Sequence, residues 1–185
     1  MNDEKIIALF FERSEQAIAE LDRKYGAACR SVSFHILGNR EDAEECVNDA
    51  YLGAWNAIPP AKPHPLLSFV CRIVRNVSLK RYEYNTAVKR NSHYDLTMEE
   101  LEDCLASSST VESELAKQEL TALIEAFLDT LSREDRVIFL RRYWFAEPYN
   151  EIAEKVGLSE KNVSVRLVRI RKRLRSYLSE REVFV

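Results

Sequence analysis

The chain has 185 residues, of which 46% are hydrophobic and 31% are charged, and its net charge is −3. This length and hydrophobic content suffice for one mid-sized core or for two small domains. Only 4 Gly and 5 Pro, with much Ala, Leu, Glu and Arg, predict an all-α protein. No apolar run approaches the roughly 20 residues of a membrane span, and the N-terminus does not resemble a signal peptide. We therefore expect a cytoplasmic protein with no direct membrane insertion.

The residue types that usually perform catalysis or hold metals are scattered along the chain. The four cysteines form no CxxC pair and have no nearby pair of histidines (Cys29, Cys46, Cys71 and Cys104). Buried or idle free thiols are favoured over a metal site or disulfides. No Gly-rich phosphate loop, nucleophile elbow or HExxH motif occurs. We predict no enzymatic activity, no cofactor and no small-molecule substrate.

The first third of the chain predicts three helices and then a strongly acidic one. The first three are expected at Asp3–Phe11, 14–25 and 27–37, the third closed by Gly38 and Asn39. The acidic helix is expected at 41–57, and residues 40–50 hold five Asp or Glu against one Arg. One face of this helix is apolar, and another carries Asp42, Glu45, Asn48, Asp49 and Leu52. We consider three interpretations of that second face: a solvated surface, a docking site for a protein, and a metal site. The metal site is less favoured because no second carboxylate motif in the chain matches it.

A stiff loop at 59–65, with four of the five prolines, precedes a basic helix that begins near residue 66. Residues 72–90 hold six Lys or Arg against one Glu, a net charge of +5. Aromatic and amide side chains are interleaved with the cations (Phe69, Tyr82, Tyr84 and Asn76). Cations for the backbone and flat rings for unstacked bases are what single-stranded DNA requires. The alternative is that Phe69 and one tyrosine belong to the core.

The next residues predict a mobile linker at 91–111, with a short helix at 97–105, and then a second domain. An amphipathic helix at 111–131 opens this domain. Ser132 is expected to cap the following helix, with Asp135 placed as in a capping box. That helix is expected to bury Val137, Ile138, Leu140 and Trp144.

Residues 149–178 predict a helix-turn-helix, whose second helix enters the major groove of DNA. Pro148 suits the first position of the first helix, Gly157 suits its end, and Ser159 suits the N-cap of the second. The second helix has one buried face, formed by Val163, Leu167, Ile170, Leu174 and Leu178. Residues 160–181 hold eight Lys or Arg against two Glu, a net charge of +6 in a chain of net charge −3. This local excess favours DNA binding over a merely solvated face.

The ordered set of motifs resembles the extracytoplasmic-function (group IV) sigma factors of bacterial RNA polymerase. The motifs are DAEECVNDAYLGAW at 42–55, FVCRIVRN at 69–76, LSREDRV at 131–137 and EIAEKVGLS at 151–159, followed by the basic helix. The match covers about residues 10–90 and 112–178. It implies two small helical domains joined by a flexible linker: region 2 at 1–90, the linker at 91–111 and region 4 at 112–185.

The resemblance implies roles for the first domain. The helix at 41–57 would bind the clamp of the largest subunit of core RNA polymerase through Asp42, Glu45, Asn48, Asp49 and Leu52. The basic helix would melt the minus-ten promoter element and capture a flipped base near Asn76. The residues implied in minus-ten binding are Phe69, Arg72, Arg75, Asn76, Lys80 and Arg81.

For the second domain, the resemblance implies reading of the minus-thirty-five element and binding to the flap of the second-largest polymerase subunit. The implied DNA-binding residues are Ser159, Lys161, Asn162, Ser164, Val165, Arg166, Arg169 and Arg173. Relatives are commonly held by an anti-sigma factor, which makes such a partner an expectation here too.

Two rival hypotheses explain less of the chain. An ordinary helix-turn-helix regulator accounts for 149–178 but not for the basic, aromatic helix at 69–90, and no clear dimerisation heptad is present. A metal-dependent helical enzyme would use Asp42, Glu44 and Glu45, which lack partner carboxylates or histidines.

Overall fold

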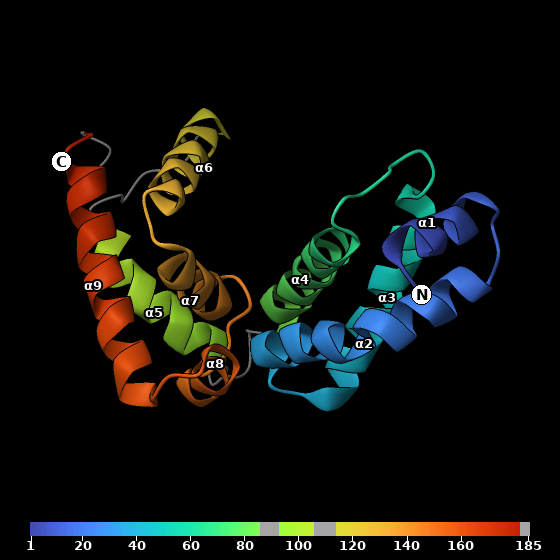
Figure 1. Cartoon of the computed structure of the whole chain (residues 1–185), viewed down its shortest axis with the longest axis horizontal. Helices are drawn as coiled ribbons and strands as arrows, with labels where there is room; N and C mark the ends of the chain where they lie inside the picture. The colour runs from blue at the N-terminus through green and yellow to red at the C-terminus, as the bar shows by residue number, and fades with distance from the viewer. Residues whose placement is uncertain (86–92, 106–113, 182–185) are drawn as a thin grey trace. The chain divides into compact units, whose positions relative to one another are not determined.

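The computed structural model describes residues 1–85, 93–105 and 114–181, and the side chains in those ranges except 93, 102–105 and 114–118. Within these ranges the chain forms nine helices and no strand, which confirms the all-α prediction (Figure 1). The helices are α1 (Asp3–Phe11), α2 (Gln16–Leu37), α3 (Arg40–Ala57), α4 (Leu66–Asn85), α5 (His93–Leu105), α6 (Glu114–Asp129), α7 (Arg133–Tyr143), α8 (Tyr149–Val156) and α9 (Glu160–Ser179). None of the described helices is long and apolar enough to cross a membrane.

The chain divides into two compact units, Met1–Tyr94 and Asp95–Val185. Helix α5 lies in the stretch expected as a linker, and it begins four residues before the short helix expected at 97–105. The remaining linker residues, and Lys89 and Arg90 of the expected basic surface, lie outside the described residues. The domain limits expected from the sequence stay a prediction.

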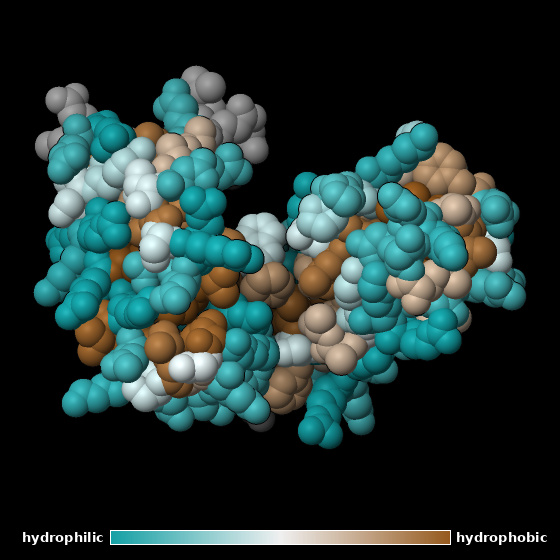
Figure 2. Space-filling model, viewed as in Figure 1, coloured by the Kyte–Doolittle hydropathy of each residue, from teal (hydrophilic) through white to brown (hydrophobic). Residues whose placement is uncertain are grey.

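The first unit is a bundle in which α2, α3 and α4 pack on one another and α1 packs on α2. Each helix contributes fully buried apolar side chains, such as Phe10, Leu21, Val47 and Val70. In Figure 2, hydrophilic residues cover most of the visible outer surface of this unit, as burial of the apolar faces requires. Asn39 caps α3 by accepting hydrogen bonds from two backbone N–H groups at the start of the helix.

One expected helix boundary is wrong. The helices expected at 14–25 and 27–37 form the single helix α2. Gly26 is buried in its middle, and an ion pair of 2.8 Å between Asp22 and Arg30 spans its position. A Cβ on residue 26 would collide with both of these side chains. Gly26 therefore lies inside a helix, where these two side chains come close to its backbone.

The second unit contains the predicted helix-turn-helix, formed by α8 and α9. Gly157 ends α8 in the left-handed conformation with a φ of 69°, and the Ser159 Oγ accepts a hydrogen bond of 3.2 Å from the Asn162 N–H. Ser132 caps α7 by accepting a hydrogen bond of 3.1 Å from the Asp135 N–H. These three predictions are confirmed. Pro148 precedes α8 as its N-cap instead of being its first residue, so that prediction was wrong by one position.

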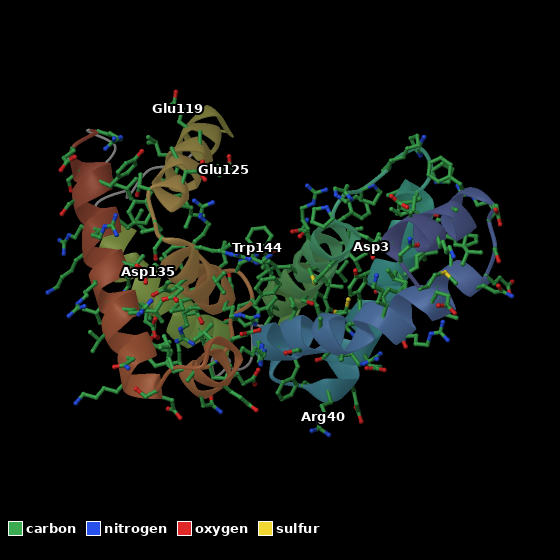
Figure 3. All side chains as sticks on the ribbon, viewed as in Figure 1. Asp3, Arg40, Glu119, Glu125, Asp135 and Trp144 are labelled. Carbon is green, nitrogen blue, oxygen red and sulfur yellow. The ribbon has the colours of Figure 1, made fainter. Side chains whose placement is uncertain are left out.

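The expected buried face of α7 is partly wrong. Ile138 is fully buried and Leu140 is half-buried, but Val137 is 38% exposed and Trp144 is 39% exposed. The Trp144 side chain is labelled in Figure 3. Phe139 and Arg142 are buried instead. The sequence pattern was misleading because Arg142 lies on the inner face of α7, where the sequence offers no visible partner for a charge.

Arg142 is stabilised by Glu100, which belongs to α5. The Glu100 carboxylate accepts hydrogen bonds from Arg142 Nη2 at 2.6 Å, Arg171 Nη1 at 3.0 Å and the Tyr149 hydroxyl at 2.9 Å. It also accepts one from the Tyr143 hydroxyl at 3.1 Å. Burial raises the pKa of Glu100, but these donors outweigh burial and hold it below its usual value. One carboxylate therefore joins α5 to α7, α8 and α9.

Candidate nucleic-acid interfaces

The face of α9 opposite the core is open and cationic. The five residues expected to form the buried face are all buried, which confirms that prediction. The expected DNA-binding residues on the other side are exposed, except for the half-buried Ser164 and Arg166 (Ser159, Lys161, Asn162, Val165, Arg169 and Arg173). Lys172 and Arg175 are also exposed. Such a surface attracts the phosphate backbone of DNA and carries groups that can reach base edges.

Arg166 differs from the other cations of α9. Its guanidinium forms ion pairs with Glu134 at 2.8 Å and Asp135 at 3.3 Å, both in the first turn of α7. The hydrogen bond to Glu134 raises the pKa of Arg166, and burial offsets only part of this effect. In this structure the side chain therefore ties α9 to α7.

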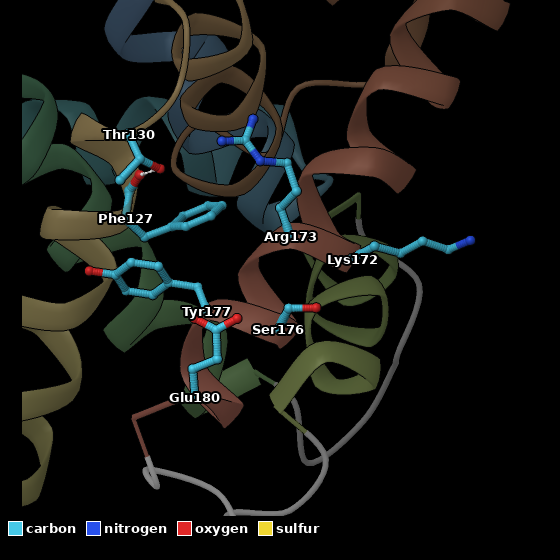
Figure 4. A pocket seen from close by; sticks show the side chains of 7 residues that line it. All are labelled: Phe127, Thr130, Lys172, Arg173, Ser176, Tyr177 and Glu180. Carbon is cyan, nitrogen blue, oxygen red and sulfur yellow. Dashed lines mark hydrogen bonds between the residues drawn. The ribbon is translucent and has the colours of Figure 1, made fainter.

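An open pocket lies between the end of α6 and the last turns of α9 (Figure 4). Its volume is about 320 Å³, and the rings of Phe127 and Tyr177 approach to 5.4 Å between centroids. Lys172 and Arg173 line it, and their side chains leave α9 in different directions in Figure 4. Arg173 thus belongs both to the cationic face and to an aromatic pocket. The sequence did not predict this pocket, because only the fold brings Phe127 next to Tyr177.

In the first unit, α4 presents Arg72, Asn76 and Lys80 to solvent, with Phe69 half-buried beside them. The Arg72 guanidinium carbon lies 5.6 Å from the centroid of the Phe69 ring, within the range of a cation–π contact. Phe69 is half-buried, so it is neither a fully buried core residue nor fully exposed, and its role in stacking stays a prediction. This face combines cations, an amide and a flat ring.

The other two expected minus-ten residues lie away from that face. Arg75 is half-buried, and burial lowers its pKa against the opposing effect of Tyr94. Arg81 turns toward α3, where it forms an ion pair with Glu45 and another of 3.3 Å with Asp42. The structure therefore brings together residues that the sequence had placed on two separate surfaces.

The expected docking face of α3 is open along most of its length. Glu45, Asn48 and Asp49 are exposed, and Leu52 is 58% exposed while the other side of the helix is buried. An accessible leucine beside carboxylates suits a protein interface. Asp42 is half-buried and accepts a hydrogen bond of 3.1 Å from the Asn85 side chain.

No group of three metal-binding side chains occurs among the described residues. Cys29, Cys46 and Cys71 are free and buried. The side chain of Cys104 lies outside the described residues.

Comparison with known proteins identifies the family of the chain. Residues 21–87 match the family model for sigma-70 region 2, and residues 121–174 match the model for sigma-70 region 4. The two matches follow one another in the order of that family and cover more than half of the chain. The chain belongs to the extracytoplasmic-function group of the sigma-70 family. It is therefore a sigma factor, a protein that acts with RNA polymerase and promoter DNA in transcription initiation.

One solved structure that resembles this sigma factor is described as CnrH in complex with the cytosolic domain of CnrY. The two chains share 21% sequence identity, the match covers 96% of this chain and 97% of that one, and the TM-score is 0.44. The search of curated proteins gives no match.

The region 2 match contains α3, α4 and most of α2, and the region 4 match contains α8 and α9 up to residue 174. Glu100 lies outside both matched segments. Its role was missed because it is one of several acidic residues in a stretch of weak periodicity, and nothing local distinguishes it from Glu99.

Proposed function

We propose that region 2 of this sigma factor opens the minus-ten promoter element and that region 4 reads the minus-thirty-five element as a duplex. The observation that supports this best is that each unit has its own exposed cationic face, on α4 and on α9. The face of α4 also has a ring and an amide, which suit unstacked bases. The face of α9 has the form of a recognition helix in a helix-turn-helix.

At the minus-ten element, strand opening costs a few kcal/mol for each base that leaves the stack. Arg72 and Lys80 would hold the backbone of the separated strand. Phe69 would stack on an unpaired base, and Asn76 would bond to the edge of a flipped one. Arg81 would act indirectly, because its partners Asp42 and Glu45 hold it against α3.

At the minus-thirty-five element, α9 would lie in the major groove with its first turns toward the bases. Lys161, Arg169 and Arg173 would contact phosphates and fix the register, and Asn162 would reach a base edge. Arg166 would hold the helix at its angle on α7 through Glu134 and Asp135.

Binding to core RNA polymerase would use the open face of α3 against the clamp of the largest subunit. Leu52 supplies apolar contact area, and Glu45, Asn48 and Asp49 form a polar rim around it. Region 4 would bind the flap of the second-largest subunit. An anti-sigma factor that competes for these surfaces, and a cytoplasmic location, are proposed from the family resemblance.

A reconstituted transcription assay tests the proposal. Full-length protein is added to core RNA polymerase with promoters obtained by in vitro selection, and run-off transcripts are measured. We expect promoter-specific transcripts only when the sigma factor is present. If the protein binds the selected DNA but never confers initiation on the polymerase, it is an ordinary helix-turn-helix regulator and the proposal is wrong.

A further inference from the structure

A stripe on α9 combines two exposed valines with two lysines. Lys161, Val165, Val168 and Lys172 follow one another at steps of four, three and four residues, so they share one face of the helix. Val165 is 42% exposed and Val168 is 37% exposed. Their neighbours on α9, Val163 and Leu167, are fully buried. The two valines are thus an apolar centre on the helix face that is turned away from the core.

The ends of this stripe fit the dimensions of DNA. Lys161 and Lys172 are eleven residues apart, which corresponds to about 16 Å along a helix. The major groove is about 12 Å wide. Long lysine side chains at the two ends can therefore reach the phosphates that border the groove, while the residues between them face the base edges.

Valine has no hydrogen-bonding group, so it can recognise only an apolar feature of a base edge. In the major groove that feature is the C5-methyl group of thymine; the other groups on the base edges are hydrogen-bond donors and acceptors. The flanking lysines and Arg169 disfavour an apolar protein partner on this face, because its docking would desolvate their charges. Charge complementarity selects DNA as the occupant.

We propose that Val165 and Val168 select thymine in the minus-thirty-five element by contact with its C5-methyl group. This inference rests on the proposed placement of α9 in the major groove. It adds the chemical basis of base choice, which phosphate contacts cannot supply.

The test removes the methyl group from the DNA and from the protein separately. Duplexes are selected with the full-length protein, each thymine is replaced in turn by uracil, and dissociation constants are measured at fixed salt. Uracil at one or two adjacent positions should weaken binding by about three- to fivefold, the change expected from one lost methyl contact. Val165→Ala should weaken binding to the thymine duplex, and uracil should then have no further effect at the same position.

Matched variants separate this contact from general effects. Val165→Thr keeps one methyl group and should retain part of the preference for thymine over uracil. Val137→Ala makes the same truncation as Val165→Ala at a valine of α7 that is 38% exposed, and it should leave the preference unchanged. Circular dichroism checks that each variant is folded.

Two different failures can be distinguished. If no thymine in the selected sites is sensitive to uracil while Arg169→Ala still weakens binding, α9 binds DNA but the proposed reading by methyl contact is wrong. If Arg169→Ala and Lys161→Ala also leave binding unchanged, the placement of α9 in the groove is wrong, and the inference falls with it.

Discussion

Two arginines of α9, three residues apart, differ in what their side chains contact. Arg169 is exposed on the cationic face, whereas Arg166 is paired with Glu134 and Asp135. A guanidinium held by two carboxylates would have to exchange them for phosphate before it contributed to DNA affinity. The exposed guanidinium of Arg169 would not have to exchange these carboxylates for phosphate.

The two variants should therefore behave differently on promoter DNA. Arg169→Ala should reduce affinity and lower the slope of log K against log salt by about one. Arg166→Ala should change this slope much less, and should lower stability by about 0.5 kcal/mol because its ion pairs are partly exposed. Binding is measured by fluorescence anisotropy over a series of salt concentrations. An equal loss of slope in the two variants would show that Arg166 also contacts phosphate.

Gly26 provides a second test at the scale of single residues. Replacing a glycine inside a helix by alanine usually stabilises a protein by about 1 kcal/mol. Here the added Cβ would collide with Asp22 and Arg30, so Gly26→Ala should give no gain or a loss. In an Asp22→Ala, Arg30→Ala background, which removes both clashing side chains, the usual gain should return. Urea unfolding measures both effects, and a full gain in the otherwise unchanged protein would contradict the close packing at this position.

At the scale of elements, α5 is held on region 4 by a buried ion pair. Glu100→Gln would leave Arg142, which is 5% exposed, without a balancing charge. We expect region 4 to lose about 3 kcal/mol of stability, the usual cost of breaking a buried pair from one side. Hydrogen exchange of the α7 and α9 amides in the full chain measures this loss. Glu99→Gln changes the same charge at an exposed neighbour and should have little effect.

The same contact predicts how the stability of region 4 depends on pH. The pKa of Glu100 is lower in the folded protein than its unfolded value of about 4.3. Its stabilising contribution is therefore fully present above the unfolded pKa and is lost as the pH falls through the folded value. Hydrogen exchange between pH 6 and pH 3 should show a steeper loss of protection in the wild type than in Glu100→Gln. Identical profiles would show that this carboxylate does not stabilise the fold.

The docking face of α3 calls for variants that leave the intramolecular pairs intact. Charge reversal at Asp42 or Glu45 would also break contacts with Arg81, so a loss of polymerase binding could have two causes. Asp49→Lys with Leu52→Ala avoids this problem and should weaken binding to core polymerase about tenfold or more, since it reverses a charge and removes apolar contact area on the proposed docking face. Glu4→Lys, on α1, serves as a charge-matched control. Unchanged affinity would place the docking face elsewhere.

Much of the helical architecture was predictable because local signals determine it. Ser132, Ser159 and Gly157 mark helix ends through their own backbone and side chains, and the spacing of Val163 to Leu178 marks the buried face of α9. Predictions from the sequence were wrong where the burial or orientation of a side chain depends on a partner that is distant in the chain. The buried Arg142 depends on Glu100, which lies 42 residues away, and the orientation of Arg81 depends on Glu45, which lies 36 residues away. Neither pairing can be predicted from the periodicity of a single helix.

For the whole molecule, the central proposal is that two cationic faces perform different steps of initiation. One face contacts single-stranded DNA and the other contacts duplex DNA. The face of α4 is suited to separated strands, and the face of α9 is suited to a duplex. A variant in one face should therefore affect one step of initiation and spare the other.

Permanganate reactivity of thymines in the minus-ten element, in holoenzyme reconstituted with core polymerase, tests this proposal most directly. Asn76→Ala should reduce the reactivity that reports strand opening while leaving the affinity for closed duplex promoter within about twofold, because the side chain acts only on a flipped base. Arg169→Ala should weaken closed binding instead, and opening should be restored at high protein concentration. If Asn76→Ala opens the promoter as well as the wild type, or loses duplex binding as Arg169→Ala does, the assignment of strand opening to α4 is wrong.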